Sequence, residues 1–150
     1  MFRYLCGMKG RITPEYIKHH ELKPEQIFVF GSNLSGRHGK GAAKDAMGWG
    51  AVWGQAAGLQ GRTYGIPTKG HSMKHILSVT EIKKFVDEFV VFAKANPQMV
   101  FCVTEIGCGY SHYEPKHMAP LFKACVELDN VWLPARFWHK LPKQEQPPLF

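Results

Sequence analysis

The clearest periodic pattern of apolar positions lies between residues 79 and 95, where apolar residues recur at spacings of three and four. These residues are Ile82, Phe85, Val86, Phe89, Val90 and Ala93. Such spacing places all of them on one face of a helix. Ser78 and Glu81 have the spacing of a capping box at the start of this segment, and Asn96 followed by Pro97 ends it. The pattern therefore predicts an amphipathic helix over Val79–Ala95.

Four short, mainly apolar runs predict strands. They cover residues 27–30, 63–66, 99–103 and 130–133. Short apolar runs bounded by polar, glycine or proline residues are typical of strands that are buried on both faces of a sheet.

Two more helices are predicted between these strands. One begins after residue 41, although Gly48 weakens its continuation. The other covers about residues 116–128, with Leu121, Phe122, Cys125 and Val126 facing inward and Pro120 in its first turn or at a bend. Strands that alternate with helices favour an α/β fold with three layers, in which helices cover both faces of a mostly parallel or mixed sheet.

The composition is consistent with one packed domain over residues 1–150. The chain is 45% apolar and 13% aromatic, and no segment approaches the roughly 20 apolar residues that cross a bilayer. The opening residues lack the apolar run of a secretory signal, and the four cysteines are irregularly spaced, so we expect a cytoplasmic protein. The proline-rich segment 138–150 is predicted to be a C-terminal arm or loose tail.

The net charge of +7 is spread along the chain. Residues 1–50 carry eight basic and four acidic side chains, whereas residues 101–150 carry five of each. A surface of this kind attracts any polyanion weakly and suits a phosphate-bearing ligand equally well. Charge alone therefore does not separate a nucleic-acid partner from a small nucleotide.

A first glycine loop, residues 31–41, joins a predicted strand to a predicted helix. Its candidate ligand residues are Gly31, Asn33, His38, Gly39, Lys40 and Gly41. Glycines allow the backbone to approach a ligand closely, so that N–H groups can cradle a phosphate, and basic side chains add positive charge. Asn33 could hydrogen-bond a ribose or a carbonyl, or instead close an Asx turn. A surface turn without a ligand is the alternative for the whole loop.

A second glycine loop, residues 106–110, follows the strand predicted at residues 99–103. It consists of Ile106, Gly107, Cys108, Gly109 and Tyr110. Its two glycines again allow close approach of a ligand, and the ring of Tyr110 could stack on it or cover it. A tight turn after a strand explains the same residues without a ligand.

Thr68 and Lys69 follow Pro67, which closes the strand predicted at residues 63–66. Lys69 could bind phosphate or act in proton transfer, although most lysines are simply solvated. Because ligands bind at the carboxyl ends of parallel strands, we expect this pair and both glycine loops to lie at one edge of the sheet.

No metal site and no cofactor are predicted. Cys102, Cys108, His112 and His117 lack the spacing of zinc ligands. Cys108 and a histidine could form a nucleophile pair, but no acid is placed to orient it. The tryptophans are predicted as core or interface residues rather than base-stacking platforms; they are Trp49, Trp53, Trp132 and Trp138.

The order of these motifs resembles the macrodomain superfamily of ADP-ribose-binding proteins. The similarity is greatest to the branch of lysine-dependent ADP-ribosyl glycohydrolases, which includes DNA-ADP-ribosyl antitoxins. It is carried by GSNLSGRHGKGAAKDA from residue 31, YGIPTKGH from residue 64 and VFCVTEIGCGY from residue 100, in order over residues 26–133.

The resemblance implies a three-layer fold, an ADP-ribose-like ligand, and Lys69 as the residue that attacks or protonates at the distal ribose. Two aspartates of the superfamily are absent: Tyr110 and Ser111 replace one, and Ala42 and Ala43 occupy the stretch of the other. Our leading hypothesis is therefore ADP-ribose binding, extended as a further hypothesis to hydrolysis of ADP-ribosyl linkages on protein or nucleic acid. The alternatives are a non-catalytic nucleotide or nucleic-acid binding module and an assembly protein on a nucleotide-binding fold.

Overall fold

The structure, a computed structural model, describes residues 10–142. Six strands of this part of the chain form one sheet in the order β1-β6-β5-β2-β4-β3. Their bounds are β1 Ile12–Thr13, β2 Gln26–Asn33, β3 Gly58–Gln60, β4 Thr63–Lys69, β5 Val100–Val103 and β6 Val131–Pro134. Neighbouring strands are parallel, except that β3 pairs antiparallel with β4. The predicted α/β fold with a mostly parallel sheet is confirmed; membership of the macrodomain superfamily stays a prediction.

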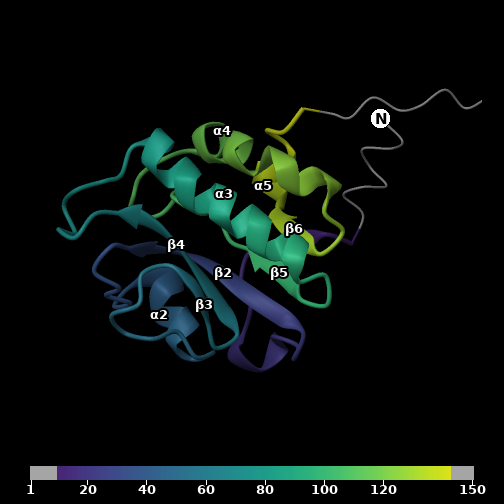
Figure 1. The fold of residues 1–150 in the computed structure, drawn as a ribbon, viewed down its shortest axis with the longest axis horizontal. Helices are drawn as coiled ribbons and strands as arrows, with labels where there is room; N and C mark the ends of the chain where they lie inside the picture. Colours follow the sequence, from purple (N-terminus) through teal and green to yellow (C-terminus); the bar gives the residue numbers. More distant parts are fainter. Residues whose placement is uncertain (1–9, 143–150) are drawn as a thin grey trace, which may run out of the picture.

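The helices lie on both faces of the sheet. They are α2 Gly41–Met47, α3 Val79–Ala95, α4 Pro115–Met118 and α5 Ala135–Trp138, with the 3-10 helices η1 His19–Glu21 and η2 Ala119–Glu127. Figure 1 shows α3, α4 and α5 on one face and α2 on the other. No helix between residues 10 and 142 combines the length and the apolar character that crossing a membrane requires.

Alternation along β2 explains the two helical layers. Ile27 and Val29 pack into the larger core with α3, whereas Phe28 and Phe30 pack into a second core with Ala46 of α2. Successive side chains of a strand point to opposite faces, so a run without polar residues must be covered on both sides. The central strand therefore dictates a helix above and a helix below itself.

The structure confirms α3 with the predicted bounds. The N–H of Glu81 donates to Oγ of Ser78 over 3.1 Å, and the N–H of Ser78 donates to the Glu81 carboxylate over 3.1 Å. This closes the predicted capping box. The apolar face is buried as expected, apart from Phe85, which is half-buried.

The prediction of one continuous helix over residues 116–128 is wrong. The segment consists of the four-residue α4 followed by the 3-10 helix η2. Pro120 has no N–H to donate and its ring obstructs the preceding turn, which disfavours a continuous α-helix. Phe122 and Cys125 are nevertheless buried as predicted.

The segment predicted as an arm or loose tail, residues 138–150, begins inside the folded domain. Trp138 is 1% exposed, and its indole N–H donates to the carbonyl of Arg11 over 2.9 Å. The guanidinium of Arg11 in turn donates to the carbonyls of Cys125 and Leu128 at the end of η2, and burial lowers its pKa. Leu141 is also buried. The core therefore continues to residue 141, while residues 143–150 of the predicted arm lie outside the described part of the chain.

Candidate functional site

The carboxyl ends of three strands meet at one edge of the sheet. β5 ends at Val103, whereas its neighbour β2 continues to Asn33 and β4 continues to Lys69. From β4 the chain crosses to the other side of β2 through α3, so the direction of the strand order changes here. Ligands of parallel α/β sheets bind at such a position. A cleft of about 680 Å³, here called the strand-end cleft, opens at this edge.

The strand-end cleft brings the predicted site residues together, with one exception. The residues that line it include Gly31, Asn33, Gly39, Lys40, Gly41, Thr68, Lys69, Ile106, Gly107, Cys108, Gly109 and Tyr110. The exception is His38, which is 1% exposed and lies behind the wall. The expectation that both glycine loops share one edge with Lys69 is therefore confirmed in its geometry, while the binding roles of these residues stay predictions.

Gly36 fixes the path of the first glycine loop. Its φ is +67°, and a side chain here would place Cβ within 2.4 Å of the carbonyl carbon of Gly54. The N–H of Gly54 donates to the carbonyl of Gly36 over 2.9 Å. This close approach of two backbone segments requires glycine and fastens the loop to residues 54 and 55.

Asn33 uses its side chain to close the same loop. Its amide nitrogen donates to the carbonyl of Arg37 over 2.8 Å, and its amide oxygen accepts the N–H of Arg37 over 3.0 Å. The side chain is only 4% exposed. Of the two roles considered for Asn33, the structure shows the turn-closing one.

His38 supports the wall from behind. Its Nε2 lies 3.0 Å from the carbonyl of Gln55, so the ring donates there, and Nδ1 is buried without a hydrogen-bond partner among residues 10–142. The imidazole stands edge-on to Phe30 and Trp53, with ring centroids 5.2 Å and 6.5 Å away. His38 therefore joins the core to an aromatic residue of the cleft.

The second glycine loop leaves its backbone donors free. Gly107 has a φ of +77° and packs against Met118, where an added Cβ would lie 2.7 Å from the sulfur. The N–H groups of Gly107, Gly109 and Tyr110 have no acceptor within the described residues 10–142. The N–H of Cys108, between them, donates to the carbonyl of Glu105 over 3.0 Å, so the adjacent free donors are those of Gly109 and Tyr110. Adjacent free N–H groups in a turn can form an anion-binding concavity.

A buried pair of hydroxyls joins β4 to the second glycine loop. Oγ1 of Thr68 and Oγ of Ser111 lie 2.8 Å apart, and both residues are buried. Ser111 was not among the predicted site residues. The two hydroxyls hold the end of β4 against the loop, which fixes one wall of the cleft next to Lys69.

Tyr110 lies across the mouth of the cleft. Nζ of Lys69 is 5.5 Å from the centre of its ring, and Nζ of Lys40 is 6.0 Å from it. A Cβ on Gly41, whose φ is +59°, would lie 3.0 Å from the same ring. The tyrosine therefore bridges the start of α2 and the end of β4, and attracts both cations to its face.

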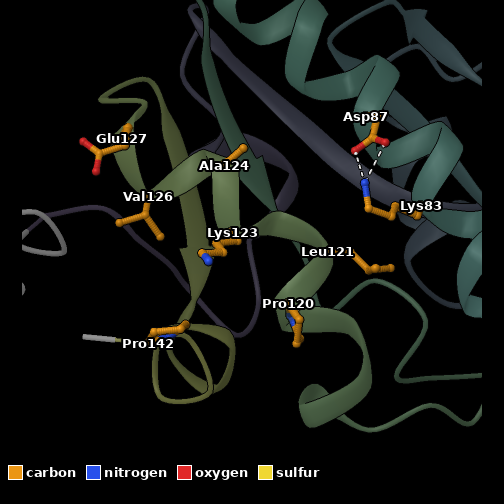
Figure 2. A pocket seen from close by; sticks show the side chains of 9 residues that line it. All are labelled: Lys83, Asp87, Pro120, Leu121, Lys123, Ala124, Val126, Glu127 and Pro142. Carbon is orange, nitrogen blue, oxygen red and sulfur yellow. Dashed lines mark hydrogen bonds and ion pairs between the residues drawn. The ribbon is translucent and has the colours of Figure 1, made fainter. Parts of the chain in front are cut away.

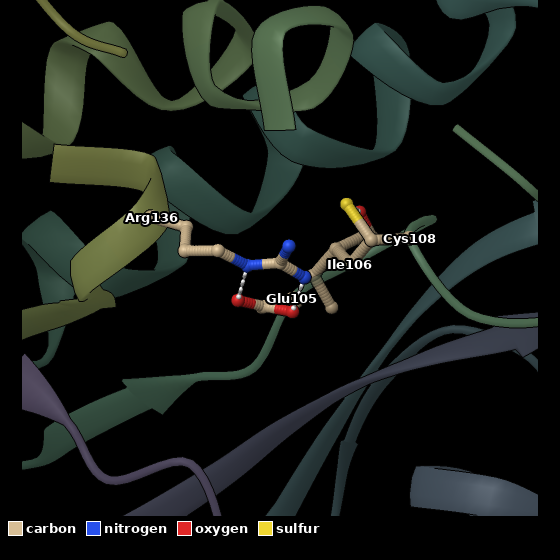
Figure 3. Close-up of polar contacts among 4 residues, drawn as sticks. All are labelled: Glu105, Ile106, Cys108 and Arg136. Carbon is tan, nitrogen blue, oxygen red and sulfur yellow. Dashed lines mark hydrogen bonds and ion pairs between the residues drawn. The ribbon is translucent and has the colours of Figure 1, made fainter. Parts of the chain in front are cut away.

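The unpaired charges of the cleft are positive. Arg37, Lys40 and Lys69 line it and form no ion pair within residues 10–142. The carboxylate of Glu105 also lines it, but accepts two hydrogen bonds from Arg136, from Nε over 2.7 Å and from Nη2 over 2.5 Å (Figure 3). These hydrogen bonds raise the pKa of Arg136. With its one lining acid neutralised, the described cleft favours an anion.

Cys108 is poorly suited to nucleophilic chemistry. Burial raises the pKa of its thiol to about 11, and the neighbouring Glu105 carboxylate adds to the effect. The thiol is therefore protonated at neutral pH, whereas the thiolate is the nucleophile. Among residues 10–142, no three His, Cys, Asp or Glu side chains gather closely enough to hold a metal ion.

The cleft also contains aromatic and apolar residues that were not predicted. Trp53 is 59% exposed and Met73 is 40% exposed, and both line it. Of the two places predicted for the tryptophans, core or interface, Trp49 and Trp138 lie in the core, whereas Trp53 does not. No periodic pattern marks Trp53, because it lies in a glycine-rich connection between α2 and β3.

A second hollow of about 640 Å³ lies between α3 and η2 (Figure 2). Its walls carry Pro120, Leu121 and Pro142, and no residue of either glycine loop contributes. At its edge, Nζ of Lys83 pairs with the Asp87 carboxylate over 2.8 Å. This hollow lacks the free backbone donors of the strand-end cleft, which is therefore the better candidate for a phosphate-bearing ligand.

Comparison of the chain with protein-family models, curated proteins and solved structures gives no match.

Proposed function

We propose that the strand-end cleft binds a phosphate-bearing nucleotide of the ADP-ribose type. The observation that carries this proposal is the set of three N–H groups, on Gly107, Gly109 and Tyr110, that have no acceptor among residues 10–142. These donors lie in a cleft in which Arg37 and Lys40, neither of them paired with an acid among the described residues, are the cations that we assign to the phosphates. Backbone donors and cations together are the usual protein groups for phosphate oxygens.

The size of the cleft supports a ligand larger than a phosphate ion. Its volume of about 680 Å³ falls within the range of roughly 300–1,000 Å³ that is common for small-molecule sites. Apolar contacts from Met73 and Trp53 stand beside the phosphate-binding groups. A nucleotide offers both the charged and the planar parts that such a lining can hold.

The identity of the nucleotide rests on the resemblance to macrodomains. The three motifs that carry it contribute Gly39 to Gly41, Thr68 with Lys69, and Ile106 to Gly109 to one cleft. Motifs separated by up to about 70 residues would not share a cleft by composition alone. Their convergence supports one ligand site at this edge, and the choice of ADP-ribose as its ligand rests on the resemblance alone.

Isothermal titration with ADP-ribose tests this proposal. We expect saturable binding and a rise in the unfolding temperature of the full chain. Lys40→Ala should weaken binding because it removes a cation of the cleft, whereas Lys83→Ala, in the second hollow, should leave it unchanged. Absence of heat together with absence of thermal protection would overturn the proposal.

Lys69 is the residue of the cleft that we assign to chemistry on the distal ribose. It ends β4, lines the cleft and forms no ion pair within residues 10–142, so its amine is held near a ligand without a carboxylate partner. A neutral amine in this position can attack the ribose carbon, forming a C–N bond as the bond from that carbon to the leaving group breaks. A protonated amine can instead give its proton to the leaving-group atom as that bond breaks.

Lys69→Ala should therefore abolish the release of ADP-ribose from an ADP-ribosylated protein or oligonucleotide while changing the Kd for free ADP-ribose by less than about threefold. Lys74→Ala, five residues further along and not lining the cleft, is the matched control. Unchanged turnover in Lys69→Ala would remove Lys69 from the mechanism and leave a binding module.

A further inference from the structure

Trp53 has a large exposed side chain that contributes little to the packing of the fold. Its side chain is 59% exposed and lines the strand-end cleft, next to Met73 at 40%. The other large aromatic residue of the cleft, Tyr110, is 57% exposed. Rigidly exposed apolar side chains grouped in one cleft are a common mark of a binding surface.

The backbone around Trp53 is held firmly. The N–H of Val52 donates to the side-chain oxygen of Gln60 over 2.8 Å, and the N–H of Gln55 donates to the carbonyl of Val52 over 3.0 Å. The N–H of Gly54 donates to the carbonyl of Gly36 over 2.9 Å. Hydrogen bonds therefore fix residues on both sides of Trp53, and its position in the cleft is prepared before a ligand arrives.

The indole is also supported by a neighbouring ring. His38 stands edge-on to it, with an angle of 74° between the ring planes, and is itself fixed by Gln55 and Phe30. On the side of the first glycine loop, a Cβ on Gly39 would come no closer than 4.0 Å to the indole. A T-shaped contact covers at most one face of the indole, and with 59% of the side chain exposed the ring stays open to another planar group.

We infer that the face of Trp53 stacks on a nucleobase of the ligand, and that Trp53 is the base-binding residue of the cleft. The inference rests on the proposed function, because it takes the phosphates to lie at the free N–H groups of the second glycine loop. Stacking on an aromatic ring tolerates every base, since each base has a π face. The base belongs either to the bound nucleotide itself or to a nucleic-acid strand that carries it.

The test compares ligands with and without a base. Trp53→Ala, Trp53→Phe and Val52→Ala are titrated with ADP-ribose, with ribose 5-phosphate and with a short single-stranded DNA. Val52 is the matched control, because it is 48% exposed in the same loop but does not line the cleft. Far-UV circular dichroism and the unfolding temperature establish that each variant is folded.

We expect Trp53→Ala to bind ADP-ribose about 5- to 100-fold more weakly than the wild-type chain, as loss of one base–aromatic stack predicts. Binding of ribose 5-phosphate should not change, and Trp53→Phe should restore most of the lost affinity. If the loss appears with the oligonucleotide and not with ADP-ribose, the stacked base belongs to the strand, and the inference still holds.

Two results would overturn the inference: equal weakening of ADP-ribose and ribose 5-phosphate, or no effect of Trp53→Ala on any probe. A failure of the proposed function would look different from either of these two results. It would appear in the wild-type chain as no binding of ADP-ribose, and the oligonucleotide titration would then decide the role of Trp53 alone. Wild-type protein that binds none of the three probes would overturn both.

Discussion

The two glycine loops have similar compositions but differ in which of their polar groups are hydrogen-bonded within the protein. In the first loop, Asn33 is bonded to Arg37, and Gly36 is packed against Gly54. In the second loop, the N–H groups of Gly107 and Gly109 have no acceptor within residues 10–142. Residues 33–37 of the first loop are therefore bonded within the protein, whereas free N–H groups among residues 10–142 remain at residues 38–40 of that loop and at Gly107, Gly109 and Tyr110 of the second.

The difference follows from what each loop has to connect. The first loop carries the chain from β2 to α2, and its residues 33–37 bond to one another, to Lys69 and to Gly54 in the segment before β3. Buried backbone groups must be paired, and a long loop pairs them with itself and its neighbours. The second loop turns at the open end of β5, where the strand-end cleft takes the place of a neighbour. Glycine content alone therefore does not identify a phosphate-binding loop.

The largest expected effect is in the first loop. Gly36→Ala combines a positive φ with a Cβ that would lie 2.4–2.8 Å from the backbone of Gly54 and Gln55. Because backbone cannot move aside as a side chain can, we expect a loss of about 3 kcal/mol or more in the free energy of unfolding, measured by urea denaturation. Gly39→Ala is the control and should stay within about 1 kcal/mol of wild type. Equal stability of the two variants would contradict the packing of Gly36.

An intermediate effect is expected at Asn33. Asn33→Ala removes both hydrogen bonds to Arg37 and leaves a partly buried carbonyl and N–H without a partner. The free energy of unfolding should fall by about 2 kcal/mol. If stability were unchanged while ADP-ribose affinity was lost, Asn33 would be a ligand contact after all, and the contrast between the loops would weaken.

The smallest effect on stability is expected in the second loop. Gly109 has an ordinary φ, and a Cβ there would meet nothing within 4 Å. Gly109→Ala should therefore change the free energy of unfolding by less than about 0.5 kcal/mol. The added methyl group stands where a ligand would approach the backbone. Titration should therefore show that the variant binds ADP-ribose about tenfold more weakly than the wild-type chain. Unchanged affinity would show that this loop does not hold the ligand.

Much of the fold was accessible from local patterns. α3 has its predicted bounds because its periodicity, its capping box and the following Asn96 and Pro97 all agree. The division of residues 115–127 into α4 and η2 was predicted only as a first turn or a bend at Pro120. The burial of Trp138, one of the two places predicted for the tryptophans, depends on a contact with a distant segment. The tail pattern, for example, could not show that Trp138 reaches the carbonyl of Arg11.

The residues of the candidate site also divide into those that could be predicted from the sequence and those that could not. Its glycine loops and Lys69 were predictable, because glycine-rich turns and a terminal lysine follow apolar strands, and parallel strands end at one edge. His38 and Trp53 were not, since a histidine in a polar loop gives no sign of burial and a tryptophan gives no sign of exposure.

The sequence by itself determined that helices cover both faces of the sheet and that the candidate site lies at the carboxyl ends of its strands, because apolar runs and the glycine-rich turns that follow them are local patterns. Only the tertiary structure decided which polar groups remain free. Asn33 and the backbone of Gly109 are equally polar in isolation; whether each is paired depends on segments that come near only when the chain has folded.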